Sequence, residues 1–85
     1  MEIRFSNEGF EDLNYWKKNN PQMVNRIKKL LENILESPYE GIGKPEPLKY
    51  GLSGFWSRRI NQEHKLVYRV KDEIIEVISC RYHYR

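Results

Sequence analysis

The hydrophobic pattern of the chain changes period along its length, and each period predicts a kind of element. Residues 1–5 alternate apolar and charged side chains, as a short strand does. Over residues 6–19 and again over 21–36, apolar side chains recur at helical spacing, and Asn20-Pro21 separates the two predicted helices. The second helix has the clearest apolar stripe: Met23, Val24, Ile27, Leu30, Leu31, Ile34 and Leu35.

Residues 38–47 interrupt this pattern, because three prolines and two glycines lie among these ten positions. We therefore expect an irregular loop there. After it the period returns to two, which predicts strands over 55–60, 65–70 and 74–85. Strands joined by short loops pair antiparallel. The sequence thus predicts one α+β domain over residues 1–85, with an N-terminal strand and two helices packed on one face of an antiparallel sheet.

Composition is typical of a globular domain, and the use of cysteine predicts a cytoplasmic protein. It has 85 residues, of which 39% are hydrophobic and 32% are charged. No apolar run approaches the roughly 20 residues of a membrane span, and the first residues lack the apolar core of a signal peptide. A single cysteine, Cys80, excludes an internal disulfide and is typical of a reducing compartment. Because Cys80 lies in an apolar strand pattern, we interpret it as a packing residue.

The net charge of +3 is distributed unevenly. Residues 1–43 hold six Lys/Arg and seven Asp/Glu, whereas residues 44–85 hold nine and five, so the two halves carry −1 and +4. An anionic partner is therefore expected at the second half.

Few side chains of the sequence could carry chemistry. His83 titrates near neutral pH when unperturbed, and alternation places it on the same face of the last strand as Arg81. His64 lies in a predicted turn or strand entry, and we assign it a structural role. Glu46 stands between two prolines that restrict its backbone, so its carboxylate is held in place.

These residue types suit the metal-free cleavage of RNA. A base removes the proton of the ribose 2′-OH, an acid protonates the leaving 5′-oxygen, and cations stabilise the charge on phosphorus. The same set would suit a module that only binds RNA, and periodicity does not separate the two. No metal site is expected, because the two histidines are 19 positions apart and there is one cysteine. No cofactor motif is present in the sequence either.

Four ordered blocks resemble the YoeB toxins, of the Txe/YoeB branch of the RelE toxin superfamily. The blocks are KPEPLK at 44–49, LSGFWSRRI at 52–60, EHKLVY at 63–68 and CRYHY at 80–84. The resemblance extends over nearly the whole chain and includes YW at 15–16. It implies a microbial-RNase-like fold, cleavage of mRNA in the ribosomal A site, neutralisation by a YefM-type antitoxin, and a homodimer.

The resemblance also implies roles for particular residues. Glu46 matches the general base, His83 the general acid, and Tyr84 the tyrosine of the catalytic region. Lys65 stands where the family has an arginine, so the cation remains but the planar fork is lost. Arg85 extends one residue past the family's usual terminal tyrosine. An inactive relative that binds only RNA or its antitoxin is the alternative.

For the basic half of the chain, contact with RNA phosphates is the corresponding expectation. The residues we expect to make this contact are Lys44, Lys49, Arg58, Arg59 and Arg81.

Overall fold

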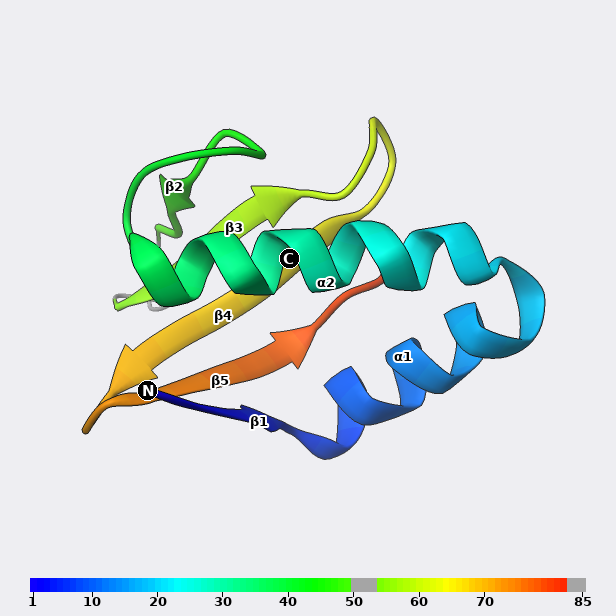
Figure 1. Cartoon of the computed structure of the whole chain (residues 1–85), viewed down its shortest axis with the longest axis horizontal. Coiled ribbons are helices and arrows are strands. Elements are labelled where there is room, and N and C mark those ends of the chain that lie inside the picture. Colours follow the sequence, from blue (N-terminus) through cyan, green and yellow to red (C-terminus); the bar gives the residue numbers. More distant parts are fainter. Residues whose placement is uncertain (50–53, 83–85) are drawn as a thin grey trace.

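Two helices cover one face of a five-stranded mixed sheet in the computed structural model, which describes residues 1–49 and 54–82 (Figure 1). In chain order the elements are β1 (Glu2–Phe5), α1 (Asn7–Asn19), α2 (Pro21–Glu36), β2 (Glu46–Pro47), β3 (Phe55–Arg59), β4 (Lys65–Lys71) and β5 (Ile74–Ser79). The strand order across the sheet is β1-β5-β4-β3-β2. β1 pairs with β5 in parallel, and the other pairs are antiparallel. The predicted α+β class is confirmed, but the prediction of a purely antiparallel sheet was wrong: β1 is itself an edge strand of the sheet, paired in parallel with β5.

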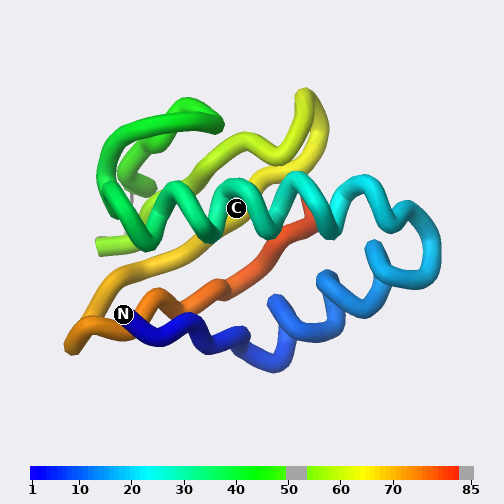
Figure 2. Tube along the Cα trace, in the orientation of Figure 1, coloured from blue at the N-terminus to red at the C-terminus, as the bar shows by residue number. Residues whose placement is uncertain are grey.

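Local sequence signals account for the two helices. The hydroxyl oxygen of Ser6 accepts the N–H of Gly9 at 3.0 Å and so caps the start of α1. Pro21 occupies the first turn of α2, where its missing N–H leaves no bond unmade. Figure 2 shows α2 crossing in front of the sheet, while α1 lies nearer β1 and β5. This arrangement brings the two predicted helices onto the same face of the sheet.

The core lies between α2 and the middle strands. The apolar stripe of α2 packs with residues of β4 and β5 that alternate toward the helices. Its fully buried members include Met23, Ile27, Ile34, Leu66, Tyr68, Ile75 and Val77. The alternate side chains of each strand therefore point to the opposite face of the sheet. The predicted catalytic residues within the sheet lie on that face.

Two predictions of regular structure were wrong. The loop over residues 38–47 contains the two-residue strand β2, which pairs with β3 at the edge of the sheet. An edge strand tolerates Pro47, because a proline there leaves no sheet hydrogen bond unmade. The last strand, predicted to begin at residue 74 and run through the end of the described chain, ends at Ser79; Arg81 and Tyr82 form a bend.

None of the helices in the described ranges, 1–49 and 54–82, is long and apolar enough to cross a membrane.

Candidate active site

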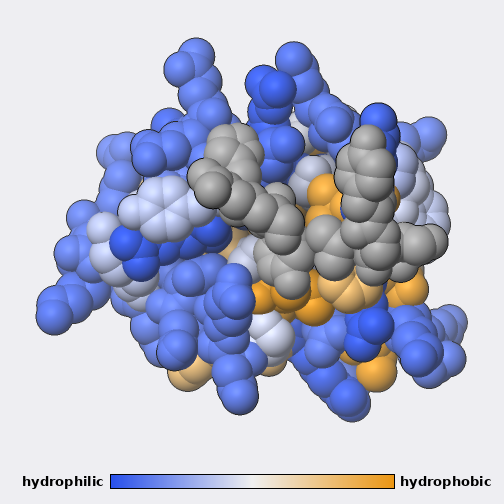
Figure 3. Space-filling model, turned by 180° about the vertical axis from the view of Figure 1, so that it is seen from behind, coloured by the Kyte–Doolittle hydropathy of each residue, from blue (hydrophilic) through white to orange (hydrophobic). Residues whose placement is uncertain are grey.

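Strand register brings Glu46 into a row across the helix-free face of the sheet. Glu46 pairs with Ser57, Ser57 with Val67, and Val67 with Ser79. Paired residues present their side chains to the same face, so these four form one line across four strands. Ser57, Val67 and Ser79 are buried, whereas Glu46 at the edge is exposed. The predicted base is thus accessible to a ligand at the rim of this face. Figure 3 shows the face from behind, with polar side chains predominant around its margin.

Lys65 and Arg59 lie on the same face, one row away. They pair with each other and stand two positions along their strands from Val67 and Ser57. Glu46 and Lys65 are therefore separated by two strand spacings, about 10 Å, and by one step of roughly 7 Å along the strands. Since both side chains are long, a phosphodiester can fit between the carboxylate and the ammonium. The structure brings these two predicted residues together on one surface.

The end of the described chain meets the start of β4. The carbonyl of Tyr82 accepts the backbone N–H of Lys65 at 3.0 Å. His83 follows Tyr82 directly in the sequence, so the residue before the predicted acid lies beside Lys65. The predicted catalytic residues His83 and Tyr84 themselves, like Arg85, lie outside the described residues.

Side chains from α1 hold the chain directly after β5. The indole N–H of Trp16 donates to the carbonyl of Cys80 at 2.8 Å, and the Cys80 N–H donates to the carboxylate of Asp12 at 3.0 Å. Both backbone groups of Cys80 are thus bound to side chains and are not available to a sheet partner. This explains why β5 stops at Ser79. Sequence reasoning did not assign Asp12 or Trp16 this function, because their bonds join positions 64 to 68 residues apart.

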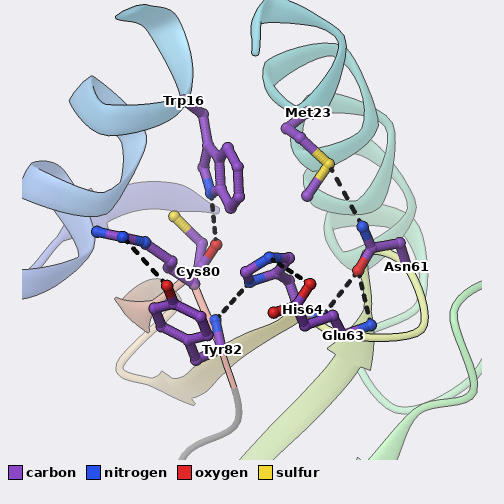
Figure 4. A network of polar contacts seen from close by, with 8 residues as sticks. Trp16, Met23, Asn61, Glu63, His64, Cys80 and Tyr82 are labelled. Carbon is purple, nitrogen blue, oxygen red and sulfur yellow. Dashed lines mark hydrogen bonds and ion pairs between the residues drawn. The ribbon is translucent and has the colours of Figure 1, made fainter. Parts of the chain in front are cut away.

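His64 binds the same segment from the other side. Its Nδ1 accepts the backbone N–H of Tyr82 at 2.7 Å, and its Nε2 lies 3.6 Å from the carboxylate of Glu63 (Figure 4). The ring is 7% exposed and packs edge-on against Trp16. The structural role predicted for His64 is confirmed.

Cys80 is fully buried, as its place in an apolar pattern predicted. Burial, reinforced by the nearby carboxylate of Asp12, raises the pKa of the Cys80 thiol to about 12. Its thiol donates to the carbonyl of Gly9 at 3.6 Å. A thiol in this state is not a nucleophile at neutral pH.

The prediction that Arg58 contacts RNA was wrong. Arg58 points to the helix side of β3 and is fully buried. Its guanidinium donates to the side chain of Asn33, to the hydroxyl of Tyr68 and to three backbone carbonyls, those of Ser37, Glu40 and Ile42. A guanidinium committed to these acceptors cannot reach a phosphate. Alternation along the sequence puts Arg58 on the same side of β3 as Trp56, but it does not tell which side the helices cover.

The other predicted RNA-contacting cations fall into two groups. Lys44, Lys49 and Arg59 are exposed. The guanidinium of Arg81 instead stacks on Tyr15, with its Cζ 3.5 Å from the ring centroid, and also donates to the hydroxyl of Tyr82 at 3.3 Å. Contact of these four with RNA stays a prediction.

Arg59 lines a shallow hollow that sequence reasoning did not identify. Arg26, Lys29 and Leu30 line it from α2, Ile42 and Gly43 line it from the loop before β2, and Ile60 lines it directly after β3. No acidic side chain lines this hollow among the residues that the structure describes. The packing of α2 beside β3 brings Arg26 and Lys29 to the same hollow as Arg59.

No cluster of three or more His, Cys, Asp or Glu side chains that could hold a metal ion occurs within residues 1–49 and 54–82.

Comparison with known proteins gives one consistent family. Residues 5–84 match the YoeB-like toxins of bacterial type II toxin-antitoxin systems. Toxin YoeB of Escherichia coli strain K12 is 48% identical over 84 residues, which cover 99% of this chain and 100% of that protein.

Comparison with solved structures gives the same family. The YoeB dimer from Staphylococcus aureus superposes with a TM-score of 0.93 at 50% identity, and the YoeB-YefM complex from the same organism with a TM-score of 0.91 at 52% identity. Each match covers 99% of this chain and 98% of the other.

Proposed function

Because the chain belongs to the YoeB-like toxins of bacterial type II toxin-antitoxin systems, we propose that it is an endoribonuclease that cleaves mRNA in the ribosomal A site. Cleavage there inhibits translation in the bacterial cytoplasm. The observation that supports this best is the sheet register, which gathers Glu46, Lys65 and the residue before His83 at the helix-free face. The roles of His83 and Tyr84 rest on the family resemblance.

The proposed chemistry needs a base, an acid and a cation. The carboxylate of Glu46 accepts the proton of the ribose 2′-OH, and the 2′-oxygen attacks the adjacent phosphorus. The bond from phosphorus to the 5′-oxygen breaks, and His83 donates a proton to that leaving oxygen. The ammonium of Lys65 stabilises the negative charge that grows on the phosphoryl oxygens. Tyr84 belongs to the same catalytic region. Neither a metal nor a cofactor takes part in these steps.

Two protein partners follow from the same family. We propose that a YefM-type antitoxin neutralises this toxin and that the chain forms a homodimer, by analogy with the YoeB dimer and the YoeB-YefM complex from Staphylococcus aureus. A non-catalytic module that binds only RNA or the antitoxin is the alternative, and the first experiment below distinguishes it.

Replacing the proposed base and acid tests their roles. Glu46→Gln and His83→Gln should each keep ribosome binding and slow single-turnover cleavage by about 10²–10⁴-fold. A 5′-phosphorothiolate linkage has a leaving group that needs no acid, so it should restore cleavage by His83→Gln but not by Glu46→Gln. Glu40→Gln, a change at an exposed carboxylate of the same loop, is the matched control and should cleave normally.

Lys65 gives a third comparison within the same assay. Lys65→Arg should retain or raise single-turnover cleavage, whereas Lys65→Ala should lower it with little change in affinity. Equal rescue of the Glu46 and His83 variants would contradict the assignment of base and acid. Absence of cleavage by the unmodified chain would favour the non-catalytic alternative. Unchanged cleavage in Glu46→Gln would mean that another group is the base, and full activity of Lys65→Ala would remove that residue from the site.

A further inference from the structure

Three elements converge on residues 80–82, the described end of the chain. Asp12 and Trp16 of α1 bind both backbone groups of Cys80. His64, in the turn before β4, accepts the N–H of Tyr82. The first N–H of β4, that of Lys65, donates to the Tyr82 carbonyl. The backbone that leads to His83 is therefore fixed by side chains as well as by the sheet (Figure 4).

The imidazole of His64 is suited to this contact. Because its Nδ1 accepts a hydrogen bond, the proton of the neutral ring resides on Nε2. The ring centroid lies 4.7 Å from that of Trp16 in an edge-to-face arrangement and 5.0 Å from that of Tyr82. The ring orientation is thus fixed by packing on two sides, which aims Nδ1 at the Tyr82 N–H.

Tyr82 has an unusual backbone at this point. Its φ is +60°, in the left-handed region that non-glycine residues seldom occupy. Such a conformation persists where surrounding contacts determine it. At Tyr82 those contacts are the bonds from its N–H to His64 and from its carbonyl to Lys65. The direction in which the chain leaves Tyr82 depends on them.

We propose that His64 is a positioning residue for the cleavage reaction: by holding the Tyr82 N–H it fixes the direction in which the chain continues to His83. This inference rests on the proposed function, since it concerns the delivery of the proposed acid. His64 does not itself touch the RNA. A displacement of an acid by about 1 Å can slow a reaction by about 10²-fold, so the contact matters to the rate.

Two variants of His64 distinguish the effect of losing the hydrogen-bond acceptor from the effect of losing the packed ring. His64→Phe keeps an aromatic ring between Trp16 and Tyr82 but has no acceptor. His64→Asn places an amide oxygen near the position of Nδ1 and so keeps an acceptor. Glu63→Gln, at the adjacent exposed residue, is the matched control. Amide NMR spectra of each variant establish that it is folded.

The first measurement does not depend on RNA cleavage. Hydrogen exchange of the Tyr82 amide should be at least about 10-fold faster in His64→Phe than in the unmodified chain. It should be partly restored in His64→Asn and unchanged in Glu63→Gln. Unchanged Tyr82 exchange in a folded His64→Phe would overturn the inference, whatever the activity of the protein.

The second measurement uses ribosomes programmed with mRNA. His64→Phe should slow single-turnover cleavage by about 10–10²-fold while ribosome affinity changes less than about twofold, with partial recovery in His64→Asn. The 5′-phosphorothiolate substrate should remove most of the defect, because the step that needs a positioned acid is then bypassed. A defect equally large on both substrates, or no defect at all, would overturn the positioning role. If the unmodified chain fails to cleave, the proposed function fails, and with it the role in cleavage, while the exchange measurement still decides whether His64 holds Tyr82.

Discussion

Among single residues, Asp12 combines a structural hydrogen bond with an unfavourable charge. Burial raises the pKa of its carboxyl above the ordinary value, although the Cys80 N–H and Arg81 act in the opposite direction. A raised pKa in the folded state means that the carboxyl's contribution to stability is complete below the unfolded pKa and is lost as pH rises through the folded pKa. At neutral pH the ionised form of Asp12 therefore lowers stability.

Asp12→Asn should consequently be more stable than the unmodified chain at pH 7. The amide oxygen of Asn can still accept the Cys80 N–H, and the partly buried charge is gone. The difference in Tm should shrink to nothing near pH 3, where the carboxyl of Asp12 is protonated. Thermal unfolding followed by circular dichroism from pH 3 to pH 7 measures this dependence.

The matched change Asp12→Ala removes the acceptor as well. It leaves the Cys80 N–H without its partner and should lower stability by about 1–3 kcal/mol at both pH values. If Asp12→Asn were instead less stable at pH 7, attraction between Asp12 and Arg81 would outweigh desolvation of the carboxylate.

Sequence reasoning identified some of the important residues and missed others for a physical reason. Glu46 and Lys65 were found from flanking prolines, alternation and the family pattern, and register places them on one face. The contacts of Asp12 and His64 were not found, because they join segments far apart in the sequence and involve backbone groups that periodicity does not describe.

Strand β3 illustrates how an element can fix a neighbouring loop. Three backbone carbonyls accept hydrogen bonds from the Arg58 guanidinium. Ser37 is the C-cap residue of α2, and Glu40 and Ile42 lie in the loop after it. Carbonyl oxygens at a helix C-terminus carry partial negative charge, which stabilises a cation there. Farther along, the Arg59 N–H donates to the carbonyl of Gly43 at 2.6 Å. The loop that precedes Glu46 is thus bound to β3.

Arg58→Lys should therefore destabilise the fold and impair the site together. Lysine keeps the charge but lacks the planar fork that serves several acceptors at once. Because each buried acceptor left without a donor costs roughly 1–3 kcal/mol, we expect a loss of about 3 kcal/mol or more in the free energy of unfolding. Denaturation in guanidinium chloride measures it, with activity assayed on the folded protein.

The adjacent Arg59 provides the control on the other face of the same strand. Arg59→Gln should change the free energy of unfolding by less than about 0.5 kcal/mol, because its side chain is exposed. If both substitutions changed the free energy of unfolding equally, the hydrogen bonds from Arg58 to the loop would not be what stabilises the fold.

At the scale of helices and strands, the alternation of side chains along each strand was predictable, and the residues at which the strands end were not. The strands predicted over residues 55–60 and 65–70 correspond to β3 and β4, which pair in an unbroken register. The end of β5 depends on side chains of α1 that bind Cys80, and β2 consists of two residues in a segment dominated by proline. A single sequence contains the period of an element, whereas its boundaries are decided by tertiary contacts.

The molecule is small: the Cα atoms of its fold extend over 31 × 26 × 23 Å, which limits how much RNA it can position alone. Its predicted RNA-contacting cations are spread over the loop before β2, the segment after it, the end of β3 and the segment after β5. Arg26 and Lys29 extend this basic surface onto α2 around the hollow at Arg59. We expect such a surface to hold the toxin against ribosomal RNA, while the ribosome itself presents the mRNA to Glu46.

Neutralising this surface should reduce the salt dependence of ribosome binding. When a protein cation contacts a phosphate, counterions are released, and each contact contributes about 0.7–0.9 to the slope of log affinity against log salt concentration. The double change Lys49→Gln/Arg59→Gln should weaken binding and lower that slope by about 1.4–1.8. Lys17→Gln/Lys18→Gln removes the same charge from the last turn of α1 and should leave the slope unchanged. Binding titrations from 50 to 300 mM salt, about a sixfold range, resolve the difference. An equal loss of slope in both doubles would mean that net charge alone governs binding, and an unchanged slope in the first would place the phosphate contacts elsewhere on the molecule.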